Sequence, residues 1–206
     1  MKGIIDSAPD ISKIDVTPTG YSTTVLAANG EETATLVGQG ANRQYVTIDE
    51  IPLDLQHAFV AIEDERFYDH NGIDLHGIGR AFISGLSKGR FSEGASTITQ
   101  QLIKNNVLTS WTSETSFVEK LQRKIQEQYL ALELEKQVND KDWILENYMN
   151  SVNLGANTLG VQAASKKYFN KDVSELTLSE ASVIAGITQN PSGYNPITHP
   201  DKNAKR

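Results

Sequence analysis

The chain has 206 residues, of which 38% are hydrophobic and 22% charged, and its formal net charge is −7. This composition is typical of a folded domain and not of a disordered chain. The acidic balance argues against a general surface for nucleic acid or for anionic membranes. The sequence has no cysteine, which excludes disulfides and thiolate chemistry, and its four histidines form no HExxH-type metal pattern.

The front of the chain predicts a β-hairpin. Residues 1–20 are polar and contain two prolines, so we expect them to be irregular. Two β-prone runs then flank Asn29-Gly30, a pair that is typical of tight hairpin turns. We therefore expect an irregular segment and a β-hairpin over residues 1–40, followed by one main domain over residues 41–206.

From Ile51 onward the pattern is helical, because apolar residues recur at positions 55, 58, 59 and 62. Further helices are predicted over residues 76–86, 96–108, 117–137, 142–152, 160–169 and 177–187, with loops over 87–96 and 109–116. Ser96 is the predicted N-cap of its helix. The long helix carries an apolar face formed by Phe117, Leu121, Ile125, Tyr129 and Leu132. The predicted fold class is mainly α with one N-terminal β-hairpin.

Glu63 stands at an unusual place, directly after the apolar run 59–62. Four consecutive apolar residues cover almost every side of a helix, so we expect that helix to be buried on most faces. Phe67, Tyr68 and His70 follow closely and offer aromatic walls and hydrogen bonds. The pattern favours a general acid or base, although a solvated carboxylate at a helix end is the ordinary alternative.

A second candidate is the pair Arg123 and Glu127, which are four residues apart and share a helix face. The pair fits a surface ion pair worth ~0.3–0.5 kcal/mol. The pair also fits a polar stripe that faces a second lobe of the protein. The helix is largely apolar around its whole circumference at residues 129–132, so it should enter a core there. The spacing alone leaves both interpretations open.

A third candidate is the segment GASTITQQLIKNN, which is dense in hydroxyl and amide side chains and ends in Lys104. Helix N-terminal amides, hydroxyls and one lysine favour an anion or sugar site, and a capped surface helix is the alternative. In NYMNSVNLG, Tyr148 and Asn150 fit either a polar ligand or, as the pattern favours, a helix end. The residues alone indicate a helical domain suited to sugar or phosphate chemistry, without excluding a structural module.

Five stretches, in the same order, resemble the motifs of the family 51 glycosyltransferases. They are EDERFYDHNGID, GASTITQQLIKN, RKIQEQYLALELE, ILENYMNSVNLG and LTLSEASVIAGITQNPSGYNP. This family is the peptidoglycan glycosyltransferase domain of class A penicillin-binding proteins and their monofunctional relatives. The resemblance implies a lysozyme-like helical fold of two lobes with a cleft. It also implies the polymerisation of lipid II, an undecaprenyl-diphosphate-linked disaccharide-pentapeptide, into glycan strands with inversion.

The resemblance also implies roles for single residues. Glu63 matches the general base and Glu127 the second essential glutamate. Lys104, Arg123 and Lys124 match the cations that stabilise the leaving diphosphate. The remaining substrate-binding residues implied are Asp64, Phe67, His70, Ser96, Thr97, Gln100, Gln101, Asn105 and Asn150. A divalent cation, Mg²⁺ or Mn²⁺, assists some members at the diphosphate, and Glu63 is a candidate ligand for it.

The resemblance finally implies a place of action and partners. These are lipid II, the growing glycan strand, the membrane surface reached through the undecaprenyl lipid, and other cell-wall synthesis proteins, but no nucleic acid. We expect work on the extracytoplasmic face of the bacterial plasma membrane, sensitivity to moenomycin, and a parent protein whose anchor and any transpeptidase domain are missing here. The loop over residues 107–117, around Trp111, fits either a mobile flap that touches lipid or a disordered loop. A lysozyme-like hydrolase and a silent glycan-binding module are the rival interpretations.

Overall fold

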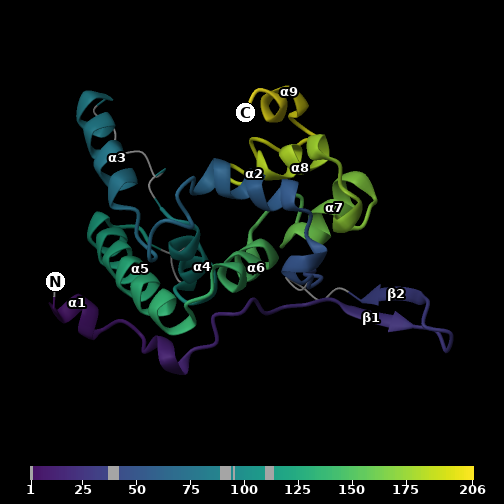
Figure 1. Ribbon diagram of the computed structural model, residues 1–206, viewed down its shortest axis with the longest axis horizontal. Coiled ribbons are helices and arrows are strands. Elements are labelled where there is room, and N and C mark those ends of the chain that lie inside the picture. Colours follow the sequence, from purple (N-terminus) through teal and green to yellow (C-terminus); the bar gives the residue numbers. More distant parts are fainter. Residues whose placement is uncertain (1, 37–41, 89–93, 95, 110–113) are drawn as a thin grey trace. The chain divides into compact units, whose positions relative to one another are not determined.

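The computed structural model describes residues 2–36, 42–88, 94, 96–109 and 114–206 (Figure 1). The described elements are mostly helices, with one two-stranded antiparallel sheet near the N-terminus. The predicted fold class, a mainly helical domain with an N-terminal hairpin, is therefore confirmed. The chain divides into two compact units. The first joins Met1–Val16 to Phe59–Tyr148, and the second joins Thr17–Ala58 to Met149–Arg206.

The first unit contains most of the helices that carry the candidate motifs. Its elements are α1 (Lys2–Asp6), the 3-10 turn η1 (Ile11–Lys13), the end of α2 (Leu53–Glu63), α3 (Leu75–Lys88), α4 (Ile98–Asn106), α5 (Phe117–Val138) and the larger part of α6 (Lys141–Ser151). Helix α4 packs against α5. The core of the first unit contains Phe59, Phe67, Ile98, Leu102, Leu130, Leu134, Ile144 and Tyr148.

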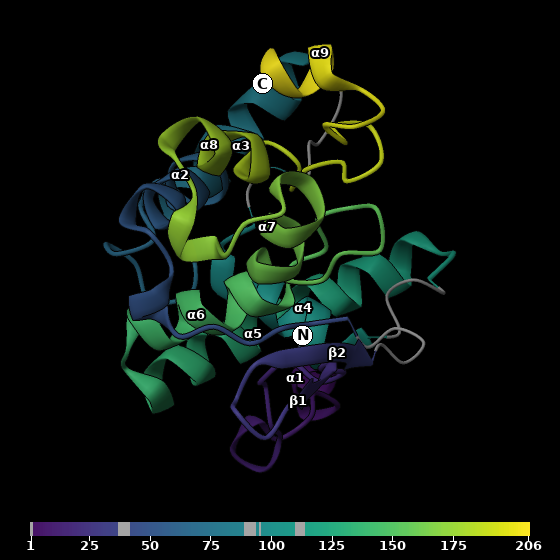
Figure 2. The ribbon, with the colours of Figure 1, turned by 90° about the vertical axis from the view of Figure 1, so that its right-hand side faces the viewer.

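The second unit is built from the hairpin and the C-terminal helices. Its elements are β1 (Thr23–Leu26), β2 (Glu32–Leu36), the 3-10 turn η2 (Ile48–Glu50), the start of α2, the end of α6, α7 (Val161–Phe169), the 3-10 turn η4 (Val173–Glu175), α8 (Leu178–Ala185) and α9 (Pro200–Ala204). Figure 2 shows α7 and α8 side by side. Gly30 turns the hairpin with φ of 86°, as Asn29-Gly30 predicted.

The predicted helices over residues 76–86, 117–137 and 142–152 are present within two residues of the predicted ends. Two details are wrong. The N-cap of α4 is Thr97, whose Oγ1 accepts a hydrogen bond from the Gln100 amide, and not Ser96. Helix α4 also ends at Asn106 and not at residue 108. The loop predictions over 87–96 and 109–116, and Trp111 with its flap, fall partly or wholly outside the described residues.

The first 20 residues are not wholly irregular, because they contain α1 and η1. Helix α1 packs against α5, where the Gln126 amide donates hydrogen bonds to the Ile4 carbonyl and to Ser7 Oγ (Figure 1). A five-residue helix has little stability of its own and depends on such contacts. Local sequence patterns do not record these tertiary contacts, so the sequence did not predict the helix α1.

The apolar face predicted for α5 is not the buried face. Phe117 is 79% exposed, and Leu121 and Leu132 are also exposed. The buried stripe is instead formed by Glu127, Leu130, Ala131, Leu134 and Glu135. Two carboxylates belong to this stripe because each has a lysine or arginine partner. A pattern search that scores only apolar residues therefore selects the wrong side of the helix.

Candidate active site

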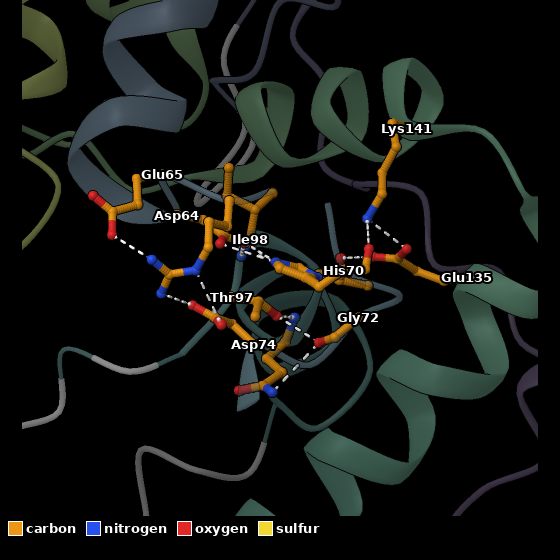
Figure 3. Close-up of polar contacts among 12 residues, drawn as sticks. Asp64, Glu65, His70, Gly72, Asp74, Thr97, Ile98, Glu135 and Lys141 are labelled. Atoms are coloured by element: carbon orange, nitrogen blue, oxygen red, sulfur yellow. Dashed lines mark hydrogen bonds and ion pairs between the residues drawn. The ribbon is translucent and has the colours of Figure 1, made fainter. Parts of the chain in front are cut away.

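Asp64 anchors the loop that follows α2. Its carboxylate is 7% exposed and accepts hydrogen bonds from His70 Nε2, at 2.9 and 3.0 Å, and from the backbone amide of Ile98, at 3.0 Å (Figure 3). Ile98 is the first residue of α4, where a negative charge is favoured by the helix dipole. The loop and α4 are thereby held together at the place where Glu63 ends α2.

A buried pair supports the same loop from the other side. Lys141 Nζ lies 2.6 Å from Glu135 Oε2 and donates a second hydrogen bond, also of 2.6 Å, to the His70 carbonyl. It also lies 4.5 Å from the centre of the Phe67 ring, which is fully buried. Thr99 Oγ1 donates to the other Glu135 oxygen at 2.5 Å. Helices α4, α5 and α6 therefore meet around one paired carboxylate.

Glu63 is half-buried and faces a small cavity. Its carboxylate accepts a hydrogen bond of 2.8 Å from Gln101 Nε2 on α4. The cavity measures about 110 Å³, and its lining includes Glu63, Asp64, Asp74, Arg80, Ser96 and Thr97. In the apolar run before Glu63, Phe59 and Val60 are buried, Ile62 is half-buried and Ala61 is exposed, so this helix is covered on most faces, as expected. Glu63, four residues after Phe59 and on the same side of the helix, is half-buried at the end of α2.

Two arginines neutralise the acidic residues at the rim of this cavity. Arg66 pairs with Asp74 at 2.5 Å, and Arg80 pairs with Glu65 at 2.7 Å. Burial raises the pKa of Asp74, but the hydrogen bonds from Arg66 and from the Gly77 amide, together with the charge of Arg66, outweigh it and the net shift is downward. The hydrogen bond from Arg80 lowers the pKa of Glu65. Arg66 also contacts Glu65 at 2.6 Å, so Glu65 and Asp74 stay ionised within one network that Arg66 bridges.

A second cluster joins α5 to the start of α4. Arg123 Nε donates to both carboxylate oxygens of Glu114, at 2.8 and 2.9 Å, and the same guanidinium contacts Glu127. Lys124 Nζ donates to Glu127 at 2.9 Å and to Ser96 Oγ at 2.5 Å. Glu127 is only 1% exposed, so the interpretation as a surface ion pair is wrong. Burial lowers the pKa of Arg123, but its carboxylate partners outweigh this and raise it overall.

The predicted residues of α4 separate into two groups. Gln101 bonds Glu63, and Lys104, three residues on, lies on the same face of the helix and is half-buried, as is Asn105. Thr97 and Gln100 are almost fully buried, and both donate to the Gly72 carbonyl, at 2.7 and 3.4 Å. These two side chains therefore secure the loop after α2.

Asn150 lies in the second unit and has a similar holding role. It is 1% exposed, its Nδ2 donates to the Val46 carbonyl at 2.8 Å, and its Oδ1 accepts from the Val46 amide at 3.0 Å. These bonds fix residue 46 to α6. Substrate binding by Asn150 stays a prediction.

The candidate residues do not fit a protein-held metal ion. Within the described ranges, no three His, Asp or Glu side chains converge on one point. Glu63 accepts from an amide, Asp64 from His70, and Glu127 from two cations. These arrangements leave no set of anionic oxygens of the kind that Mg²⁺ or Mn²⁺ requires.

Sequence reasoning missed three participants, namely Glu114, Glu135 and Lys141. Glu114 lies in a polar stretch without periodicity, so nothing marked it as a partner for Arg123. Glu135 and Lys141 lie on opposite sides of the break between α5 and α6. In the sequence, Glu135 is marked only as a carboxylate that directly follows the apolar Leu134.

Comparisons with known proteins agree with the motifs. The transglycosylase family model matches residues 29–206. The chain is 45% identical to penicillin-binding protein 1F of Bacillus subtilis, over 90% of the chain and 24% of that protein. It is 40% identical to penicillin-binding protein 1A/1B of the same organism, over 98% and 21%. It is 48% identical to penicillin-binding protein 1A of Clostridium botulinum, over 78% and 19%.

The family match covers most of the chain, and the five motifs lie within it. The chain therefore belongs to the transglycosylase family, as a peptidoglycan glycosyltransferase domain of the class found in penicillin-binding proteins. It spans about a fifth to a quarter of the length of the curated relatives it matches. None of the helices in the described ranges is both long and apolar enough to cross a bilayer.

Proposed function

We propose that this domain polymerises lipid II, with Glu63 as the general base and a cationic cluster on α4 and α5 as the diphosphate site. The 4-hydroxyl of the acceptor sugar attacks the anomeric carbon of the undecaprenyl-diphosphate-linked donor. The configuration inverts, the diphosphate leaves, and the hydroxyl proton passes to Glu63. The single observation that carries this proposal is the half-buried Glu63 carboxylate, held by an amide at the edge of a cavity.

The surroundings of Glu63 suit a base. Gln101 holds the Glu63 carboxylate at the cavity through one hydrogen bond, and an ionised carboxylate is the acceptor that the proton of a sugar hydroxyl requires. A base so placed contributes typically ~10²–10⁴-fold to a rate. The cavity of about 110 Å³ is smaller than the ~300 Å³ at which ligand pockets begin, so it admits only the reacting part of a disaccharide.

The leaving diphosphate needs positive charge placed in advance. Lys104, Arg123 and Lys124 supply it, and Lys124 contacts Ser96, which lines the same cavity as Glu63. This contact links the base to the cations within one unit. Preorganised cations stabilise the charge that develops as the bond to the diphosphate breaks.

Glu127 acts by positioning these cations. It is buried and contacts both Arg123 and Lys124, which fixes their head groups relative to each other. Binding of the diphosphate then adds a further anion to a cluster whose cations are already held by Glu127 and Glu114. Asp64 and His70 have the matching role on the other side, because they fix the loop behind Glu63 to α4.

The nature of the substrate determines the rest of the proposal, namely the place of action, the partners and the inhibitor. A donor on a polyprenyl lipid requires work at a membrane surface, on the extracytoplasmic face where glycan strands are laid down, with other cell-wall synthesis proteins nearby. Moenomycin, which mimics the donor in this family, would occupy the diphosphate site. No step is routed through a divalent cation, because the described carboxylates do not gather around one.

The test is a gel assay of glycan products from lipid II in detergent, with the wild-type chain and Glu63→Gln. Asp69→Asn is the matched control, because it removes an exposed carboxylate from the same loop. We expect polymer from the wild type and the control and none from Glu63→Gln. Polymer from Glu63→Gln would remove Glu63 from the mechanism. Cleavage of preformed glycan, with no polymer formed, would instead support the rival interpretation of a lysozyme-like hydrolase.

A further inference from the structure

Among the residues that the structure describes, Tyr148 is the largest side chain that is completely buried, and its hydroxyl lies next to the site. Its ring packs edge to face against Phe59, with ring centres 6.1 Å apart. Its hydroxyl lies 3.2 Å from Oε1 of Gln101. A phenylalanine would pack against Phe59 in the same way, so packing does not explain the presence of the hydroxyl.

The hydroxyl is fixed as a donor toward Gln101. Burial raises the pKa of Tyr148 well above its ordinary value, and the charges of Glu63 and Asp64 raise it further. The phenol therefore keeps its proton at any pH at which the enzyme works. Because the amide oxygen of Gln101 can only accept, the phenol donates to it.

This donation holds the Gln101 amide in place from its other end. An amide has one end that donates and one that accepts, and an ionised carboxylate only accepts, so Glu63 selects the orientation in which the amino end faces it. The amino end donates to Glu63 at 2.8 Å, and the amide oxygen, which then points away, is held by the phenol at 3.2 Å. The two hydrogen bonds together fix the rotamer of Gln101 between Tyr148 and Glu63.

We propose that Tyr148 is a positioning residue that orients the Glu63 carboxylate through the Gln101 amide. The inference rests on the proposed role of Glu63 as the base. Two hydrogen bonds in series connect the buried part of α6 to the end of α2 by way of α4. Without the phenol, the Gln101 amide can rotate, and the base spends less time in the orientation that accepts a proton.

The variant Tyr148→Phe removes the hydroxyl and keeps the ring. We expect kcat for polymerisation of lipid II to fall about tenfold, while KM for lipid II and the dissociation constant of moenomycin stay within twofold. Tyr168→Phe is the matched control. It also loses a half-buried phenol, one that donates to the Leu154 carbonyl in the second unit, and its kcat should not change.

A double-mutant cycle separates positioning from a purely structural role. In the Gln101→Met background, Tyr148→Phe should have no further effect on kcat, because the connecting amide is gone. The same tenfold loss in both backgrounds would overturn the proposal, and so would an unchanged kcat in folded Tyr148→Phe. Circular dichroism melts establish that each variant is folded.

Gln101→Met alone keeps the proposal testable if Tyr148→Phe does not fold. It should lose at least as much kcat as expected for Tyr148→Phe while retaining its KM, and an unchanged kcat would overturn the proposal. The proposed function fails differently, since Glu63→Gln would then polymerise lipid II normally. A defect in Tyr148→Phe beside an active Glu63→Gln would show that the phenol acts on another group.

Discussion

Lys141, at the start of α6, holds the buried carboxylate of Glu135, near the end of α5, at a distance of 2.6 Å. Removing one member of a buried pair leaves a charge without its partner. We expect Lys141→Met to lower the free energy of unfolding by about 2–4 kcal/mol, because Glu135 is buried but Lys141 is partly open to solvent. Urea unfolding followed by circular dichroism measures it.

The control for this prediction is Lys136→Met, which removes an exposed lysine from α5 and should change stability by less than ~0.5 kcal/mol. Combining Lys141→Met with Glu135→Gln should restore part of the loss, since the stranded charge is then absent. An unfolding free energy for Lys141→Met equal to that of the wild type would show that the pair contributes no stability.

Hydrophobic spacing predicted where the helices lie, and it failed to predict the buried face of a helix where polar groups decide it. The helices over 76–86 and 142–152 were found to within two residues, whereas the buried face of α5 was missed because it contains Glu127 and Glu135. The N-cap of α4 was misplaced by one residue, since serine is the better cap by propensity and Ser96 directly precedes Thr97. Only the fold shows that Thr97 also reaches the Gly72 carbonyl.

The candidate site was predictable as a set of residues but not as an arrangement. The motifs identified Glu63 and Gln101, 38 positions apart, yet their hydrogen bond exists only because Asp64 fastens the loop after α2 to α4. Gly72 shows the same dependence. Its φ is 86°, and an added Cβ would lie 2.6 Å from the Ala131 carbonyl, which is a tertiary constraint that no local pattern records.

Glu127→Gln should abolish most polymerisation without unfolding the chain. The amide keeps the shape of the side chain but cannot balance the charges of Arg123 and Lys124, so the two head groups separate. Loss of such electrostatic preorganisation is typically worth ~10²–10³-fold in rate. Initial rates with lipid II give the size of the effect. Glu133→Gln, on the same helix, serves as the control and should keep its rate. A Glu127→Gln rate within a factor of two of wild type would contradict the positioning role.

We expect the free energy of unfolding of the second unit to fall at acidic pH, because Glu180 then becomes protonated. Lys171 Nζ donates to both of its oxygens, at 2.8 and 2.9 Å. This hydrogen bond, together with the Thr177 amide, lowers the pKa of Glu180 from 4.5 to about 2. A carboxylate with a lowered folded-state pKa contributes stability above its unfolded pKa and loses it as the pH falls through the folded value.

The expected loss from Glu180 therefore occurs between pH 4.5 and about 2. Lys171→Met should be less stable than wild type at pH 7, and the difference should vanish near pH 2. Denaturant unfolding at a series of pH values tests this, with Lys167→Met, an exposed lysine on α7, as the control. A difference between wild type and Lys171→Met that is the same at pH 7 and pH 2 would exclude Glu180 as its cause.

Glu114 should compete with the diphosphate for Arg123. Both oxygens of its carboxylate accept from Nε of Arg123, and phosphate oxygens bind arginine through the same kind of charged N–H donor. We expect Glu114→Gln to lower KM for lipid II and the dissociation constant of moenomycin by about threefold to tenfold. This corresponds to ~0.7–1.4 kcal/mol of removed competition. Glu119→Gln is not a suitable control, because Glu119 caps α5, so Glu133→Gln is used again.

The direction of the Glu114→Gln effect distinguishes two roles for this residue. A competitor, when removed, gives tighter binding that weakens steeply with salt, because the freed guanidinium then meets the diphosphate alone. A residue that instead holds Arg123 in its working orientation gives weaker binding when removed. Titration of moenomycin at low and high salt with wild type and Glu114→Gln separates the two. Weaker binding in the variant at both salt concentrations would show that Glu114 preorganises the diphosphate site.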